Sequence, residues 1–208
     1  METVVVIDCG VGNVMSVVNA CLNITQKIDV VSKASDLENS NASRIIFPGV
    51  GAAGRCLQLL REKSLDSAIT KKAAEQKIPF LGICVGMQVL ASKCEEFGDH
   101  HGLNLIPGKV KSIDRLSEKI IVPHVGWNTI EVREKKRKIF ALHGMDFYFV
   151  HSYHFSCKEQ YCLARTEYGQ KFNSIIHNEN IFGVQFHPEK SSEAGQNLLK
   201  IFIEHGKL

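Results

Sequence analysis

The sequence lacks long hydrophobic runs, paired-cysteine motifs and a large excess of either charge. The apolar run at residues 4–7 is too short for a signal-peptide core, and no stretch approaches the length of a membrane span. Seven cysteines stand without a CxxC pair or a Cys/His spacing typical of zinc. A net charge of +3 does not indicate a nucleic-acid partner. We therefore expect a cytoplasmic protein in a reducing compartment, with no membrane or nucleic-acid partner, no metal and no cofactor.

The composition is that of an ordinary soluble chain, with 44% hydrophobic and 23% charged residues among 208. A chain of this length can bury roughly 70% of its unfolded surface, so its core needs neither disulfides nor a structural metal. Residues 133–138 form a basic run, which we interpret as a solvated loop. No linker or repeat divides the sequence, and we expect one domain over residues 1–208.

Hydrophobic periodicity in the first half predicts strands that alternate with helices. The expected strands cover residues 3–8, 29–31, 44–47 and 80–83, and helical spacing of apolar residues covers 14–22 and 57–73. Strands in alternation with helices indicate a parallel sheet covered on both faces.

The second half changes character and carries short β-like runs instead. These are expected at residues 109–113, 119–122, 129–132, 146–152, 161–166, 173–177 and 181–186, with a hairpin connection at 178–180. A closing helix begins at Ser191 or Ser192, with the serine as its cap, and ends near Gly206. The whole pattern predicts an α/β fold with a mixed sheet, parallel at its centre and flanked by helices.

A nucleophile elbow is predicted where Gly82, Cys84 and Gly86 alternate between an apolar strand and a helix-compatible segment. Glycines on both sides relieve the steric clash of so tight a turn. Backbone N–H groups at the start of the helix would stabilise a thiolate at this position. A small buried cysteine at a tight strand-to-helix junction is the alternative interpretation.

A general base for that thiol is found in the sequence His187-Pro188-Glu189. Proline keeps the preceding residue extended, and side chains two apart in extended chain share a face, so Glu189 can orient the imidazole of His187. The alternative is a histidine that serves only in a loop.

Donors for an oxyanion are expected in the glycine-rich segment that follows the strand at residues 44–47. The backbone N–H groups of Val50 and Val85 are the candidates for this role. Pro48 to Gly51 is also compatible with a plain loop after a parallel strand.

Together these segments resemble the class I (triad) glutamine amidotransferases. The chain matches their Gly-x-Cys-x-Gly-x-Gln elbow at residues 82–88 and their His-Pro-Glu motif at 187–189. Within that class the segments at residues 48–51, 123–128, 148–153 and 185–191 are similar to the glutaminase subunit of imidazole glycerol phosphate synthase, of histidine biosynthesis. The resemblance covers essentially the whole chain and implies a flavodoxin-like α/β glutaminase fold.

The resemblance also implies a reaction and a set of site residues. Cys84 attacks the glutamine carboxamide, His187 protonates the departing ammonia, Glu189 orients His187, and water then hydrolyses the thioester. The substrate-binding and oxyanion residues implied are Gly49, Val50, Gly51, Val85, Gln88, His151, Ser152 and Tyr153. Two of these have simpler alternatives, since Tyr153 is compatible with a half-exposed strand aromatic and Gln88 with a solvent-facing helix residue.

The partner implied by the resemblance is a (β/α)₈-barrel cyclase that forms a heterodimer with this chain and receives ammonia through its interior. Asn13, His124 and Trp127 are expected at the interface, although core packing explains the tryptophan equally well. Cys9 stands where the family more often has tyrosine, and Val125 where methionine is usual. A different synthase is therefore the first alternative, such as one forming an amidino sugar for a surface polysaccharide. A general cysteine hydrolase and a non-catalytic regulatory subunit are the others.

Overall fold

An eight-stranded sheet forms the centre of the computed structural model, which describes residues 3–113 and 120–208. The first five strands in spatial order run parallel, and the last three continue the sheet in antiparallel pairs. In that order they are β2 (Ile28–Val31), β1 (Val4–Ile7), β3 (Arg44–Gly49), β4 (Phe80–Cys84), β14 (Ile181–Val184), β13 (Gln170–Asn178), β12 (Cys162–Tyr168) and β9 (Glu131–Val132).

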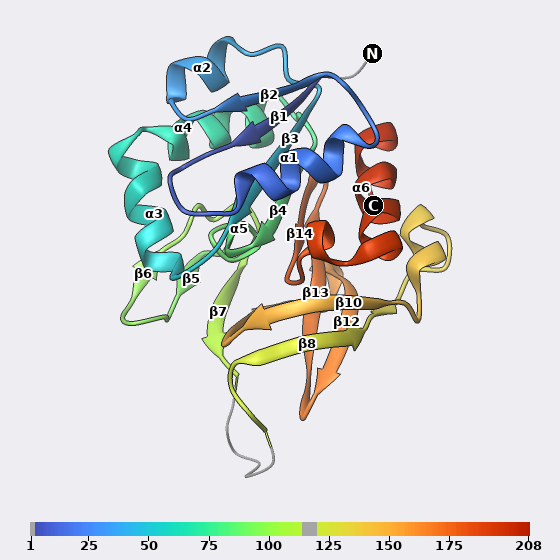
Figure 1. Ribbon diagram of the computed structural model, residues 1–208. Coiled ribbons are helices and arrows are strands. Elements are labelled where there is room, and N and C mark those ends of the chain that lie inside the picture. Colours follow the sequence, from blue (N-terminus) through green and yellow to red (C-terminus); the bar gives the residue numbers. More distant parts are fainter. Residues whose placement is uncertain (1–2, 114–119) are drawn as a thin grey trace.

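Helices cover the parallel part of this sheet (Figure 1). Helix α1 (Val14–Leu22) packs near α6 (Ser192–His205), while α2 (Ala34–Asn39), α3 (Ala53–Glu62) and α4 (Leu65–Thr70) form a second group, which a π-helical turn at Lys71–Glu75 extends. Helix α6 ends where Gly206 adopts a left-handed conformation, as the sequence predicts. The serine cap predicted for its start is not formed. Ser191 instead donates to the carbonyl of His187 and accepts from the backbone N–H of Tyr148.

Two smaller sheets complete the architecture. Strands β8 (His124–Thr129) and β10 (Asp146–His151) form an antiparallel ribbon, seen in the lower half of Figure 1. The third sheet contains β11 (Tyr153–Cys157), β7 (Gly108–Ser112), β5 (Lys93–Cys94) and β6 (His100–His101). Short helical turns lie at Val85–Gln88 (α5), Lys138–Leu142 (η2), Glu159–Tyr161 (η3) and Pro188–Lys190 (η4).

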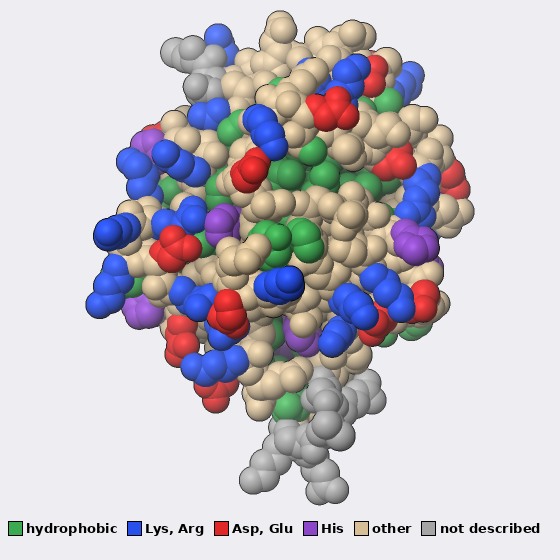
Figure 2. Space-filling model, turned by 180° about the vertical axis from the view of Figure 1, so that it is seen from behind, with side chains coloured by type: hydrophobic (Ala, Val, Ile, Leu, Met, Phe, Trp, Pro, Cys, Tyr) green, Lys and Arg blue, Asp and Glu red, His purple; other side chains and the backbone are tan. Residues whose placement is uncertain are grey.

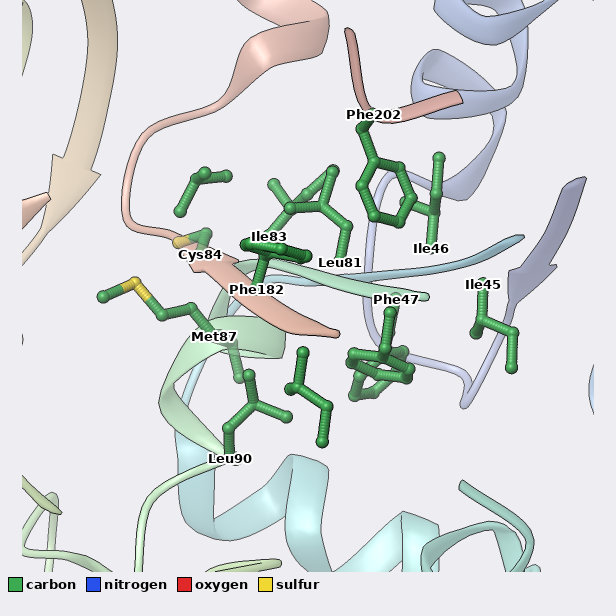
Figure 3. Close-up of a cluster of buried hydrophobic side chains, with 14 of the residues drawn as sticks. Ile45, Ile46, Phe47, Leu81, Ile83, Cys84, Met87, Leu90, Phe182 and Phe202 are labelled. Carbon is green, nitrogen blue, oxygen red and sulfur yellow. The ribbon is translucent and has the colours of Figure 1, made fainter. Parts of the chain in front are cut away.

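The core lies between the parallel strands and the helices that cover them. Strands β1, β4 and β14 are buried along their whole length, because a sheet covered on both faces requires apolar side chains in both directions. Figure 3 shows Cys84 and Met87 beside a cluster that includes Phe182 and Phe202. The predicted nucleophile therefore lies at the edge of the buried core.

The predicted fold class is confirmed, with several local corrections. Helix α2 and the two-residue strands β5 and β6 were not predicted. The strand expected at 119–122 is absent at residues 120–122, and residue 119 lies outside the described residues. The ribbon strand β8 begins at His124 and not at residue 129. Strand β11 follows β10 almost directly and was not predicted.

Charges of both signs are interspersed over the face of the molecule shown in Figure 2. Part of the basic run at 133–138 is locally paired, since Arg133 lies 2.8 Å from Glu159 and Arg137 lies 2.7 Å from Glu134. Among the described residues, no helix has the length and apolar character needed to cross a membrane.

Candidate active site

The turn from β4 into α5 is a strained elbow with Cys84 at its tip. Cys84 has φ of 54°, a region that residues other than glycine seldom occupy. A Cβ on Gly82 would come within 2.3 Å of the Gly86 carbonyl oxygen, and one on Gly86 within 2.0 Å of the Phe47 carbonyl oxygen. Both glycines are thus required by close backbone approach, which is the steric reason inferred from the sequence.

The sulfur of Cys84 is only slightly exposed and lies near two polar groups, one from β10 and one from the residue that follows β14. Cys84 is 4% exposed, and its Sγ lies 3.9 Å from the carbonyl oxygen of Val150. The side-chain nitrogen of Gln185 lies 3.9 Å from the same sulfur. A buried sulfur with a neutral donor beside it can be held in one position for reaction.

His187 and Glu189 form a buried pair behind this sulfur. Nδ1 of His187 lies 2.8 Å from Oε1 of Glu189, and their side chains are 5% and 3% exposed. Burial disfavours a charged His187, but hydrogen bonds with Cys84 and Glu189 outweigh burial and raise its pKa to about 10. The imidazole is therefore protonated at neutral pH and can donate to sulfur on one side and to the carboxylate on the other.

A cavity of about 370 Å³ opens beside these groups. The residues proposed from the sequence that line it are Asn13, Val50, Gly51, Cys84, Val85, Gln88, His151, Ser152, Tyr153 and His187. Gly49 and Glu189 do not line the cavity. A Cβ on Gly49 would come 3.0 Å from the Gly86 nitrogen. In the part of the chain that the structure describes, no cluster of three His, Cys, Asp or Glu side chains is arranged to hold a metal.

The family model for class-I glutamine amidotransferases matches residues 5–205. The chain belongs to this family. Its strand-to-helix elbow and its buried His-Glu pair are the features on which the sequence resemblance was based, and that family prediction is confirmed.

Curated relatives of this amidotransferase carry the name imidazole glycerol phosphate synthase subunit HisH. The chain is 40% identical to the one from Sulfurimonas denitrificans, with 99% of each chain covered. It is 39% identical to subunit HisH 2 of Vibrio vulnificus, covering 99% of this chain and 95% of that one. The predicted resemblance to this subfamily is confirmed by these matches.

Solved structures support the fold of the amidotransferase independently. The structure of PurLQS from Thermotoga maritima aligns with a TM-score of 0.77 at 18% identity, covering all of both chains. A glutamine amidotransferase crystal structure aligns with a TM-score of 0.75 at 20% identity, covering 97% of this chain and 98% of that chain. At these identities the likeness shows the fold alone.

Three lining residues of the amidotransferase cavity had no role in the sequence analysis, namely Glu96, Val150 and Lys190. Glu96 lies between β5 and β6, outside every element predicted from the sequence, and its Oε2 accepts from the backbone N–H of Ala53 at 2.7 Å. No local pattern signals such a residue, because the fold alone brings it to the cavity. Lys190 directly follows His-Pro-Glu, so its proximity was readable from the sequence.

The residues expected at the partner interface lie in different environments. Trp127 is 54% exposed and Val125 is 55% exposed on the outward side of β8, whereas His124 is only 2% exposed. Side chains alternate along a strand, so the ring of His124 points inward and does not reach the surface. Asn13 is exposed at the cavity and caps α1 through Ser16.

His124 is part of a chain of hydrogen bonds beneath the ribbon. Its Nδ1 lies 3.0 Å from Nε2 of His151, whose Nδ1 lies 2.9 Å from the carbonyl oxygen of Tyr153. The carbonyl can only accept, so His151 carries its proton on Nδ1 and accepts from His124. Burial lowers the pKa of His151 to about 3 and that of His124 to about 4, which keeps both rings neutral.

Proposed function

We propose that this chain hydrolyses L-glutamine to glutamate and ammonia and delivers the ammonia to a synthase subunit that makes imidazole glycerol phosphate. The observation that carries this proposal is that the strained Cys84 elbow and His187 line one cavity, with the buried Glu189 paired to His187 behind it. The names of the relatives support the pathway.

The residues of the cavity can perform the reaction in two steps. The Cys84 thiolate attacks the carboxamide carbon, and backbone N–H groups of Val50 and Val85 stabilise the resulting oxyanion. His187 gives a proton to the departing nitrogen, ammonia leaves and a γ-glutamyl thioester remains. His187 then removes a proton from water, which attacks the thioester and releases glutamate and the thiolate. Glu189 keeps the imidazole oriented and stabilises its charge through both steps.

Glu96 supplies a recognition element for the amino-acid end of glutamine. It is the one carboxylate among the residues described as lining the cavity, and an α-ammonium group needs such an acceptor. Its Oε2 is fixed by the N–H of Ala53, which leaves Oε1 for the substrate. Ser152 and Tyr153, on the opposite strand connection, complete the pocket for the same end.

The partner is proposed to dock on exposed apolar side chains around the cavity mouth. Val150 lines the cavity and is 37% exposed, and its cross-strand neighbour in the ribbon is Val125. Trp127 extends the same outward side of β8 and lies against Tyr148. Exposed aromatic and apolar residues around a site are typical of interfaces. We propose a (β/α)₈-barrel cyclase as the partner, in the cytoplasm.

Val125 also favours a second candidate, a glutaminase that serves a different synthase. Cys9 does not, because it is fully buried beside Cys56 and cannot contact a partner. Val125 is exposed beside Trp127, so a departure from the usual methionine alters the proposed docking surface itself. A synthase forming an amidino sugar for a surface polysaccharide is the candidate acceptor. Growth of a deletion strain without histidine separates the two, because loss of growth is expected only for the imidazole glycerol phosphate pathway.

The test is glutamate production from glutamine by the purified chain, alone and with the cyclase subunit and its acceptor substrate. We expect slow hydrolysis alone, strong stimulation by the partner, and loss of at least about 10³-fold in Cys84→Ala. Retention of partner-dependent hydrolysis by Cys84→Ala would remove the catalytic assignment. Full activity of the isolated chain would contradict the partner dependence.

A further inference from the structure

Gln185 is a fully buried amide that touches the nucleophile and that the proposed mechanism does not use. It directly follows β14 and is 0% exposed. Its Nε2 lies 3.9 Å from Sγ of Cys84, and its Oε1 lies 3.2 Å from Nε2 of Gln88. Its backbone N–H donates to the Ser174 carbonyl at 2.9 Å, which fixes the main chain as well.

Hydrogen bonds link the Tyr153 carbonyl, Gln88, Gln185 and Cys84 in a row, and the carbonyl determines which way round each side-chain amide is oriented. The Tyr153 carbonyl oxygen lies 3.1 Å from the side-chain nitrogen of Gln88 and also accepts from His151. Because a carbonyl only accepts, the atom of Gln88 facing it must be nitrogen. The second hydrogen of that nitrogen then requires an oxygen on Gln185, and the nitrogen of Gln185 must face the sulfur.

This fixed direction has consequences on both sides of Gln185. Toward Cys84 it presents an N–H donor, and a donor stabilises a thiolate more than a thiol. Toward Gln88, the oxygen of Gln185 accepts one amide hydrogen of Gln88, and the Tyr153 carbonyl accepts the other. The side-chain oxygen of Gln88 is therefore left to accept from a ligand in the cavity.

We propose that Gln185 is a positioning residue that holds the Cys84 thiolate by an N–H hydrogen bond and fixes the Gln88 amide with its oxygen available to substrate. The part that concerns Gln88 rests on the proposed glutaminase function. The part that concerns the thiolate does not, since it requires only the contacts with sulfur.

The experiment measures how fast Cys84 reacts with iodoacetamide between pH 5 and 10, by mass spectrometry of the tryptic peptide spanning residues 78–93. That peptide contains Cys84 as its only cysteine. The variants are Gln185→Leu, which removes the amide, and Gln185→Glu, which keeps its shape but replaces the donor with oxygen. The same variants are assayed for kcat and KM with glutamine and the partner subunit.

Asn173→Leu is the matched control, because Asn173 is another buried amide whose nitrogen lies 3.3 Å from a cysteine sulfur, that of Cys157. We expect Gln185→Leu to shift the alkylation profile toward alkaline pH by about one unit, as loss of a hydrogen bond to a charged group requires. Gln185→Glu should shift it further, because its carboxylate repels the thiolate. The control should leave the profile of Cys84 in place, even where it lowers the unfolding temperature.

Unshifted profiles in both Gln185 variants, with circular dichroism matching the parent protein, would overturn the inference. The isosteric Gln185→Glu keeps the test available if the leucine variant does not fold. A shifted profile in a protein that hydrolyses no glutamine with any partner would reject the proposed function and support the thiolate contact. An unshifted profile in an active glutaminase would support the proposed function and reject the thiolate contact.

Discussion

The two walls of the cavity differ in how firmly the fold holds them. The buried wall consists of residues less than 7% exposed that bond to neighbouring strands, namely Cys84, Gln88, His151 and His187. The open wall consists of exposed residues, namely Asn13, Val50 and Gly51 on connections and Lys190 at the end of η4. The proposed nucleophile and base are thus fixed by the core, whereas the proposed oxyanion donor Val50 lies on a segment that the core barely restrains.

Glycine shows the same difference at the backbone. Gly86, next to the nucleophile, has no space for a Cβ, while a Cβ on Gly51 would meet nothing within 4 Å. Gly51 has φ of 84°, so a glycine is favoured at this position by the backbone conformation and not by lack of room for a side chain. Packing therefore determines the position of the thiol, whereas packing does not restrain the segment that carries the proposed oxyanion donor Val50.

The largest expected effect comes from a methyl group placed in the buried wall. Gly86→Ala brings a Cβ within 2.0 Å of the Phe47 carbonyl oxygen, which is backbone of β3 and cannot turn away. We expect a loss of more than about 4 kcal/mol in the free energy of unfolding, measured by urea denaturation.

Gly54→Ala is the matched control for that clash. Its Cβ would meet the His100 ring at 2.5 Å, but a side chain can rotate away, so we expect a change of less than about 1 kcal/mol. Equal stability of the two variants would show that the elbow is not held by close packing.

The second effect concerns the carboxylate that holds the base on the buried wall. In Glu189→Gln the side chain keeps its shape but loses the charge that helps raise the pKa of His187. We expect glutamine turnover with partner to fall on the order of 10²-fold, equivalent to about 3 kcal/mol. The exposed Glu193→Gln serves as control. Turnover equal to that of the parent protein would show that His187 needs no orienting carboxylate.

A pH titration tests the histidines behind the buried wall. His151 and His124 have folded pKa values of about 3 and 4, below the unfolded value near 6.5. Their contribution to stability is therefore present above pH 6.5 and is lost as pH falls toward the folded values. His187 has the opposite sign, because its raised pKa favours folding below 6.5 and this contribution is lost as pH rises through about 10.

Between pH 7 and 5 we expect the free energy of unfolding to fall by on the order of 2 kcal/mol for each of His151 and His124. The measurement is urea denaturation of the parent protein and of His124→Asn/His151→Asn at both values of pH. The double variant should lose less stability on acidification. An equal loss in both proteins would mean that these rings do not resist protonation.

Cys84 and His187 of the buried wall were predictable from local rules, whereas Gln88 and His151 came only from the family resemblance. The alternation of Gly82, Cys84 and Gly86 and the restriction that Pro188 places on His187 act within a few residues. Glu96 could not be predicted, because its place at the cavity depends on tertiary contacts such as the hydrogen bond from Ala53 at the start of α3. The inward position of His124 required the register of β8, which begins before the strand that the sequence pattern indicates.

Strand β11 was missed for a related reason. Its residues Tyr-His-Phe-Ser-Cys do alternate between apolar and polar side chains, although only Phe155 is buried. Only Ser152 separates β11 from β10, and no turn signal marks the boundary, so the sequence pattern does not show where one strand ends and the next begins. The closing helix, by contrast, has a continuous apolar side and ends at a glycine, and both signals are local. Sequence patterns thus located the elements that bury a face, and the structure was needed for those that line the cavity.

The smallest effect on stability is expected in the open wall, and it separates conformation from packing. Gly51→Ala meets no atom but must keep φ of 84°, which costs about 1 kcal/mol. Gly144→Ala is a matched control, with φ of 79° and equally open space far along the chain. Both should lower the free energy of unfolding alike, but only Gly51→Ala should reduce partner-stimulated glutamine turnover, because its strain restricts the segment that carries Val50. If turnover falls equally in both variants, the open wall has no special part in activation and the loss reflects stability alone.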